Sequence, residues 1–347
     1  MADPALMAQG DTLDHPLARL LVSDQARYAS QTGPCVTSEP TDAGPIWQQS
    51  TDKQASNHAK DGLYGLDHVE LSAGATGFMN VGLWVPRPDI DETRAVSSNE
   101  GTVSGGECQP LVRACERMVC AVAHAAGVQR GTRVLDCGYG LGDQCLLLAT
   151  KFGCGVIGLT KSPVQAAVAR DRVAALCLSN RVVLAEGDAV TIDVAWPALA
   201  PSPDWTPDVV LSIDSAYHYQ TRARFFAAAH AALTSASSSP ARPGRLALAD
   251  LIVPSTFATR TLFSWIPALP VANLGSIDDY VLHLDRAGFE AIEVQDVTDA
   301  VFPGLTTYLC AFPGARKWRV AGWMWWAFWK ALAARYVIVS ATVKKSV

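Results

Sequence analysis

A short apolar strand that runs into a glycine-rich turn and then a helix is the most constraining feature of this 347-residue chain. Residues 134–142 read Val-Leu-Asp-Cys-Gly-Tyr-Gly-Leu-Gly, and a helical pattern follows from Asp143 to Lys151. Glycines let the backbone turn sharply and let a ligand approach without a Cβ in the way. The order strand, turn, helix is the one that a nucleotide-binding loop requires. The alternative is a tight turn that binds nothing.

Strand and helix patterns alternate along the rest of the chain. The runs that predict strands are residues 133–137, 155–159, 181–185, 208–213, 245–252, 291–297 and 336–343. The patterns that predict helices are residues 110–126, 143–151, 163–178, 221–233, 276–287 and 315–334. Repeated βα units place parallel strands in one sheet with helices on both faces. The sequence therefore predicts an α/β fold with a Rossmann-like, doubly wound, seven-stranded sheet that has one antiparallel edge strand.

Composition divides the chain into two parts. Residues 1–76 are polar and rich in Ser, Asp, Thr, Gln and Pro, which predicts an N-terminal extension that is partly disordered or wraps around the rest. Residues 77–347 carry the α/β pattern and are expected to form one domain. Helical caps are expected in this domain at about 254–287 and 300–334.

Charge and cysteine usage exclude several kinds of partner. The net charge is −5, whereas a domain that grips nucleic acid is usually basic, so no nucleic-acid partner is expected. No apolar stretch is long enough to span a bilayer, and no signal-peptide pattern opens the sequence. We expect a cytoplasmic protein with free thiols. Cys115, Cys120 and His124 share one face of a predicted helix, but they are too few to hold a metal, and no metal site is expected.

The spacing of Gly138, Gly140 and Gly142 decides between kinds of nucleotide loop. It lacks the third glycine of a dinucleotide loop and the Gly-Lys-Ser/Thr of a P-loop. The segment resembles motif one of the class I S-adenosylmethionine-dependent methyltransferases, an acidic residue followed by three alternating glycines. The resemblance implies that S-adenosyl-L-methionine is the cofactor, that the loop lies under its methionine part, and that Asp136 helps to hold its amino group.

The ends of the next two strands extend this resemblance. Residues 158–165, Gly-Leu-Thr-Lys-Ser-Pro-Val-Gln, are similar to a segment of the cyclopropane synthase, tocopherol and sterol side-chain methyltransferase group. The resemblance implies that Thr160 and Gln165 contact the ribose region, although Ser162 and Pro163 also suit the start of a helix. It further implies that Asp188, with Ala189 beside it, contacts the adenine. The alternative for Asp188 is that it only shapes the turn.

The fourth strand ends in Ser-Ile-Asp-Ser-Ala-Tyr-His-Tyr, residues 212–219, and carries the candidate catalytic groups. Ligands of doubly wound sheets bind at the carboxyl ends of the strands, so this segment should face the transferable methyl group. His218 is the candidate general base, because imidazole titrates near neutral pH. Asp214 and Tyr217 are grouped with it. The alternative is that His218 orients other groups or belongs to the core.

Two further segments bear on the family. The spacing from Asp214 to His218 is similar to that in sterol side-chain and tocopherol methyltransferases, whereas cyclopropane synthases carry Glu where this chain has Tyr217, which argues against cyclopropanation. Residues 77–84 resemble the piece that, in this family, folds over the methionine end of the cofactor. This resemblance implies that Asn80 and Trp84 line the pocket. A plain packing role is the alternative for both.

The predicted helix 315–334 is rich in tryptophan and has Arg and Lys near its ends. One expectation is a buried cap helix, with its tryptophans in the core or around the acceptor pocket. The other is a helix at a membrane surface, because Trp flanked by basic residues suits the headgroup boundary. The second interpretation predicts a cytoplasmic protein that makes peripheral contact with a membrane.

The sequence as a whole predicts S-adenosylmethionine-dependent methyl transfer to C, O or N of a small, apolar or lipid-like acceptor in secondary metabolism. One alternative is a cyclase or other non-methylating catalyst that keeps the cofactor. The other is a lipid-binding protein with a degenerate site, against which the intact segment Asp136–Gly142 argues.

Overall fold

The computed structural model describes residues 78–84, 110–202, 205–234, 243–265, 269–312 and 316–344. Its strands are β1 (Arg133–Cys137), β2 (Gly155–Thr160), β3 (Val182–Glu186), β4 (Val209–Ile213), β5 (Arg245–Ile252), β6 (Phe289–Asp296) and β7 (Arg335–Val343). Its α-helices are α4 (Pro110–Ala125), α5 (Asp143–Lys151), α6 (Pro163–Ala175), α7 (Ile192–Ala195), α8 (Arg222–Thr234), α9 (Phe257–Trp265), α10 (Ile277–Arg286), α11 (Thr298–Ala311) and α12 (Arg316–Leu332). Its 3₁₀ turns are η3 (Ala189–Thr191), η4 (Trp196–Leu199), η5 (Ala216–His218) and η6 (Val271–Asn273). The predicted extension 1–76 lies outside the described residues.

All seven predicted strands form one sheet in the order β3-β2-β1-β4-β5-β7-β6. The first five strands in this order are parallel, and β1 lies between β2 and β4, with Asp136 beside Gly158 and Leu211. The order reverses between β1 and β4, and this topological switch point is where doubly wound sheets bind ligands. The α/β, Rossmann-like prediction is confirmed.

The predicted antiparallel strand is β7, which pairs with β5 on one side and with β6 on the other. It therefore lies one place in from the edge, and β6 is the outermost strand of this edge pair. Burial explains the order: β7 is buried along nearly its whole length, whereas β6 exposes Glu290, Glu293 and Asp296. Charged side chains on an outer strand discourage pairing with other chains.

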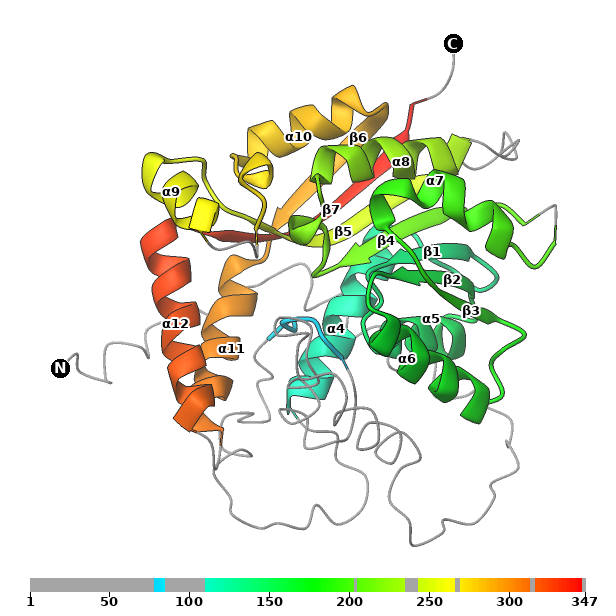
Figure 1. Cartoon of the computed structure of the whole chain (residues 1–347), viewed down its shortest axis with the longest axis horizontal. Coiled ribbons are helices and arrows are strands. Elements are labelled where there is room, and N and C mark those ends of the chain that lie inside the picture. Colours follow the sequence, from blue (N-terminus) through cyan, green and yellow to red (C-terminus); the bar gives the residue numbers. More distant parts are fainter. Residues whose placement is uncertain are drawn as a thin grey trace, which may run out of the picture. The chain divides into compact units, whose positions relative to one another are not determined.

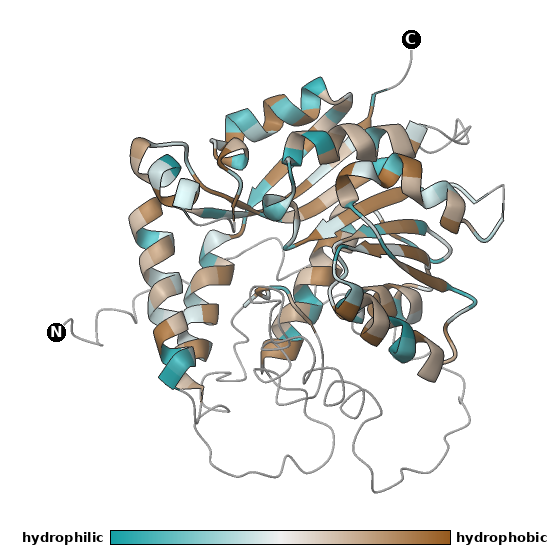
Figure 2. Cartoon of the chain, viewed as in Figure 1, coloured by the Kyte–Doolittle hydropathy of each residue, from teal (hydrophilic) through white to brown (hydrophobic). Residues whose placement is uncertain are grey.

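Helices cover both faces of the sheet, as Figure 1 shows, with α4, α5 and α6 on one face and α7, α8 and α10 on the other. The central strands are mostly apolar in Figure 2. Leu135, Val210 and Leu248, from three neighbouring strands, are completely buried in one core cluster. Strands covered on both faces read as continuous apolar runs, which is why the sequence revealed them.

The predicted cap regions contain α9 and α10 in the first and α11 and α12 in the second. Helix α10 packs against β6 and α8. Helices α11 and α12 form an antiparallel pair beyond the carboxyl ends of the strands (Figure 1). The Phe302 ring of α11 joins them by ring contacts with Trp325 and Trp329, at 6.0 and 5.6 Å between centroids. Helix α11 continues through Pro303. Of the described helices, none is long and apolar enough to cross a membrane.

Candidate active site

The turn between β1 and α5 is built from three glycines in the left-handed region. Gly138, Gly140 and Gly142 have φ of +81°, +59° and +91°. Other residues adopt such values only with strain. A Cβ on Gly138 would lie 2.1 Å from the Ser215 Oγ, and a Cβ on Gly140 would lie 2.9 Å from the Met79 Sδ. Side chains at Gly138 and Gly140 would therefore fill the space beside the turn. We call the turn with its three glycines the glycine cradle.

Asp136, on β1 just before this turn, is completely buried. Its carboxylate accepts hydrogen bonds from the Gln144 Nε2 at 2.7 Å and the Cys145 Sγ at 3.0 Å. Burial raises the pKa of Asp136 to about 6, and these two donors only partly oppose the rise. The two donors are neutral, and attraction between opposite charges is strong in a buried site. Asp136 can therefore favour a cationic group held in the turn.

Thr160 and Gln165 are brought together at the end of β2. The Thr160 Oγ1 donates to the Gln165 Oε1 at 2.9 Å, and both residues are buried. The Ser162 Oγ accepts from the Gln165 backbone N–H, and Pro163 is the first residue of α6, so the helix-start interpretation is confirmed. The Gln165 Nε2 lies 3.5 Å from the Met79 Sδ. The pair therefore faces the same methionine as Gly140.

Asp188 shapes the turn after β3. Its carboxylate accepts from the Val190 N–H at 3.1 Å and pairs with the Lys161 ammonium at 2.7 Å, while Ala189 is buried. Sequence reasoning missed the role of Lys161, because it is part of the β2 segment and only the parallel pairing of β2 with β3 brings it to Asp188. The turn-shaping role of Asp188 is confirmed, and contact with adenine remains a prediction.

Residues 78–84 are tied to three parts of the fold. The Val81 N–H donates to the Asp214 Oδ2 at 2.8 Å, and the Trp84 N–H donates to the Ala300 carbonyl. The Asn80 amide donates to the Cys115 carbonyl at 3.4 Å and accepts from the Gly82 N–H at 3.0 Å. Buried Asn80 therefore holds the segment against α4, in line with the packing alternative.

Met79 and Trp84 are the half-buried side chains of this segment. The Trp84 ring lies 5.3 Å from that of Tyr308 on α11, and Met79 lies over Gly140. Sequence reasoning missed Met79, because a methionine in an apolar segment carries no signal that separates it from core.

Asp214, Tyr217 and His218 form a chain of contacts at the end of β4. The Tyr217 hydroxyl donates to the Asp214 Oδ1 at 2.9 Å, and the Tyr217 and His218 rings lie 4.1 Å apart between centroids. Asp214 has φ of +55°, and burial raises its pKa to about 6 although Tyr217 and the Val81 N–H donate to it. The structure thus brings the three candidate catalytic residues together.

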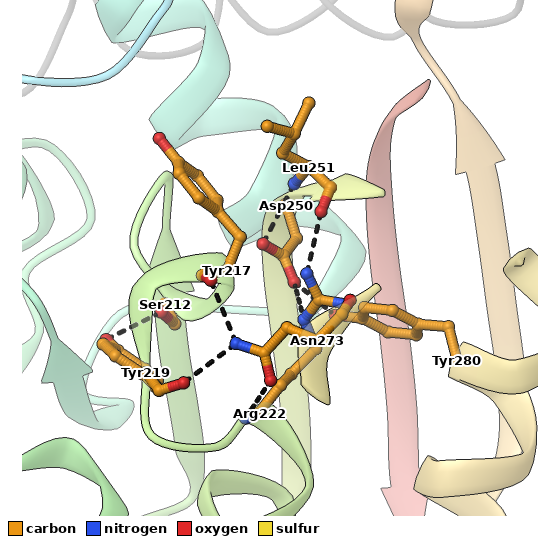
Figure 3. Close-up of polar contacts among 8 residues, drawn as sticks. All are labelled: Ser212, Tyr217, Tyr219, Arg222, Asp250, Leu251, Asn273 and Tyr280. Atoms are coloured by element: carbon orange, nitrogen blue, oxygen red, sulfur yellow. Dashed lines mark hydrogen bonds and ion pairs between the residues drawn. The ribbon is translucent and has the colours of Figure 1, made fainter. Parts of the chain in front are cut away.

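A buried polar network fixes the backbone around His218 (Figure 3). The Asn273 Nδ2 donates to the carbonyls of Tyr217 and Tyr219 at 3.0 and 2.8 Å, one on each side of His218. The Asn273 Oδ1 accepts from the Arg222 N–H. The Arg222 guanidinium pairs with buried Asp250 at 2.9 Å, and the Tyr280 hydroxyl donates to the same carboxylate. Sequence reasoning missed Asn273, Asp250 and Tyr280, because they are far from the segment 212–219 in the chain and belong to no motif.

The turn η5 also abuts the glycine cradle. The Tyr219 hydroxyl donates to the Cys137 carbonyl at 2.9 Å, and Gly138 faces Ser215. The candidate catalytic turn and the candidate cofactor loop are therefore neighbours across β1 and β4. Among the described residues there is no cluster of His, Cys, Asp and Glu that could hold a metal.

Comparison with known proteins gives no matching family model. The methyltransferase GfsG of Streptomyces halstedii is 32% identical over 273 residues, which are 78% of this chain and 86% of that protein. The erythromycin 3''-O-methyltransferase of Saccharopolyspora erythraea is 28% identical, over 69% of this chain and 70% of its own length. The 27-O-demethylrifamycin SV methyltransferase of Amycolatopsis mediterranei is 30% identical, over 61% and 73%.

Solved structures share the fold at low identity. The [4+2]-cyclase SpnF has a TM-score of 0.56 and 20% identity, over 86% of this chain and 95% of that one. A geranyl diphosphate methyltransferase in complex with S-adenosylmethionine has a TM-score of 0.56 and 16% identity, over 77% and 99%. The same fold therefore serves methyltransferases and a cyclase.

Substitution of Gly140 by Val tests the cradle. The variant should lose binding of S-adenosylhomocysteine in calorimetry, because the added side chain takes the place over which Met79 now lies. Gly131→Val is the matched control: Gly131 has φ of +82°, but a Cβ there meets nothing within 4 Å. Both variants should lose about 1–2 kcal/mol of stability from backbone strain. Normal binding by Gly140→Val would show that the loop is only a turn.

The raised pKa of Asp136 predicts a pH dependence of cofactor affinity. Asp136 is neutral below about pH 6, so affinity for S-adenosylhomocysteine, whose amino group is cationic, should fall as the pH is lowered from 7 to 5. The stability of the ligand-free protein should change in the opposite sense and fall as the pH rises. Because its pKa of about 6 lies above the ordinary 3.8, protonated Asp136 favours the folded state at low pH, and this contribution is lost as the pH rises through 6.

Calorimetry across this pH range checks the prediction with two variants. Asp136→Asn should bind more weakly at pH 8 and lose the pH dependence of affinity. Asp214→Asn removes the other carboxyl with a pKa of about 6 and should keep that dependence. If Asp214→Asn abolishes it instead, the assignment to Asp136 is wrong.

Proposed function

This chain belongs to the class I S-adenosylmethionine-dependent methyltransferases, and we propose that it methylates a hydroxyl group of a small, apolar secondary metabolite. The family follows from the 32% identity with a methyltransferase over most of both chains. Transfer to oxygen is favoured because three of the relatives are named as O-methyltransferases, among them those for erythromycin and tocopherol. The observation that supports the proposal is the contact of Ser215 and Tyr219 with the glycine cradle, because these two residues flank η5, which carries His218.

The residues of the site suit this cofactor. S-adenosylmethionine supplies a methyl group already activated on a sulfonium, and it also carries an ammonium group. We assign the cradle of Gly138, Gly140 and Gly142 to its methionine part, with Asp136 favouring its positive charge. Thr160 and Gln165 are assigned to the ribose and Asp188 to the adenine, with buried Ala189 beside it. Trp84 is assigned to the wall of the pocket.

The chemistry left to the protein is alignment of the acceptor and removal of its proton. His218 accepts the proton of the acceptor hydroxyl as the oxygen–carbon bond forms and the carbon–sulfur bond breaks. The Tyr217 ring lies against the imidazole, and Asp214 accepts the hydrogen bond of the Tyr217 hydroxyl. Asn273 positions His218 by binding the backbone on both sides of it. The methylated acceptor and S-adenosylhomocysteine are the products.

The products of the reaction distinguish the proposed methyl transfer from the alternative, catalysis by a non-methylating cyclase. Incubation with S-adenosylmethionine carrying a labelled methyl group and a panel of hydroxylated apolar compounds should give a labelled ether and one S-adenosylhomocysteine per turnover. A rearranged acceptor without label would favour the cyclase instead.

His218→Ala should lower kcat by about 100- to 10,000-fold, the usual contribution of a general base, and leave cofactor affinity nearly unchanged. Steady-state kinetics with the acceptor identified in the labelling experiment and calorimetry with S-adenosylhomocysteine measure the two effects. Added imidazole should restore part of the rate if the lost group is a base. His283→Ala, a half-buried histidine on α10, is the control and should keep full activity. A near-normal kcat for His218→Ala would show that His218 is not the base.

A further inference from the structure

Two adjacent helices carry most of the exposed apolar side chains. Ten large apolar side chains of the described residues are exposed, and seven of them lie on α9 and α12. We call these seven the α9–α12 surface: Phe257, Leu262, Trp265, Val320, Trp323, Met324 and Trp326. Phe257, Trp265 and Trp323 are 88%, 83% and 66% exposed. Isolated exposed apolar residues are ordinary, but a concentration of this kind marks an interaction site.

Helix α12 divides its aromatic residues between two faces. One face, with Gly322, Trp325 and Trp329, is turned toward α11. A Cβ on Gly322 would lie 2.7 Å from the Cys310 Sγ, and the rings of both tryptophans contact that of Phe302. Val320, Trp323 and Met324 follow the i, i+3, i+4 spacing of one helix face and are exposed. The expectation that the tryptophans all belong to the core is therefore wrong for Trp323 and Trp326.

Helix α9 continues this surface. The Phe263 ring, which is buried, lies 6.2 Å from the Phe328 ring of α12 and joins the two helices, which Figure 1 shows next to each other. The other large apolar residues of α9, Phe257, Leu262 and Trp265, are exposed.

The charges on the two helices have one sign. The sequences of α9 and α12 contain five basic and no acidic residues, although the chain as a whole has a net charge of −5. The basic residues are Arg260, Arg316, Lys317, Arg319 and Lys330, and all are exposed. Three of the four on α12 lie before Trp323 and Trp326, and Lys330 lies after them. In Figure 2 the hydrophilic residues of α12 are concentrated at its beginning.

We propose that the α9–α12 surface docks on an anionic lipid membrane. Trp rings prefer the headgroup region, where their apolar body and polar N–H are both satisfied, and basic residues beside them are attracted to anionic lipid. A buried protein contact would desolvate these basic groups, whereas the headgroup layer keeps them wet. The inference rests on the proposed function in one respect: an apolar acceptor collects in the lipid from which α9 and α12 would receive it.

Sedimentation with lipid vesicles tests the proposal on the full chain. The protein should bind phosphatidylcholine vesicles that contain phosphatidylglycerol and should bind pure phosphatidylcholine more weakly, with a blue shift of tryptophan emission on binding. Replacing Arg319 and Lys330 by Gln should weaken binding to the anionic vesicles roughly 25-fold, about fivefold for each basic residue. Arg181→Gln with Arg286→Gln, two exposed basic residues elsewhere, is the matched control and should bind as the parent does.

The apolar part is tested by Trp323→Ser with Trp326→Ser, which should abolish binding and the blue shift. The matched control is Leu176→Ser with Val194→Ser, which also replaces two exposed apolar residues, on other elements. Thermal melting and calorimetry with S-adenosylhomocysteine should be normal in all four variants, so loss of vesicle binding is separated from loss of the fold or of the cofactor site.

Two outcomes would overturn the proposal. One is that the parent protein binds neither kind of vesicle while it still binds S-adenosylhomocysteine, which leaves the proposed function intact. The other is that ultracentrifugation shows a dimer that Trp323→Ser with Trp326→Ser dissociates, because the surface would then be covered by a second copy.

Discussion

The site depends on how closely β1 and β4 can approach at the carboxyl edge of the sheet. Gly138 has no Cβ, and the volume that a Cβ would occupy is taken by Ser215 and the Tyr219 hydroxyl. This contact lets the turn after β4 lie against the turn after β1, which is the arrangement that the proposed methyl transfer requires. The backbone is also left-handed where both turns begin, at Gly138 and at Asp214.

Three buried carboxylates near this edge differ in the charge of the groups that contact them. Asp250 faces the guanidinium of Arg222, which only partly opposes the rise in pKa that burial causes, and the ion pair is part of the scaffold. Asp136 and Asp214 receive the hydrogen bonds described here from neutral groups only, and the pKa of each rises to about 6. Asp250 therefore has a cationic partner within the protein, whereas the partners of Asp136 and Asp214 named above are neutral. A ligand that carries positive charge would favour the ionised forms of these two carboxyls.

Most of the fold could be predicted from the sequence, because buried parallel strands are apolar runs and the glycine spacing after β1 is distinctive. The place of β7 could not, since a strand inserted between two earlier ones leaves no local pattern; only the charged residues of β6 hint at which strand lies outside. The same holds for the site. Motif residues such as Thr160 and Gln165 were predicted and lie together, whereas Met79, Lys161 and Asn273 depend on which distant segments meet in space.

The position of β7 has a consequence for the edges of the sheet. Strands β5 and β6 both precede β7 in the chain, yet they touch only through it. Without residues 335–343, β5 would present an unpaired apolar edge and β6 would have no neighbouring strand. Open edges of this kind are where folding chains associate wrongly with one another. The pairing of β7 therefore closes the side of the sheet that would otherwise be most open to aggregation.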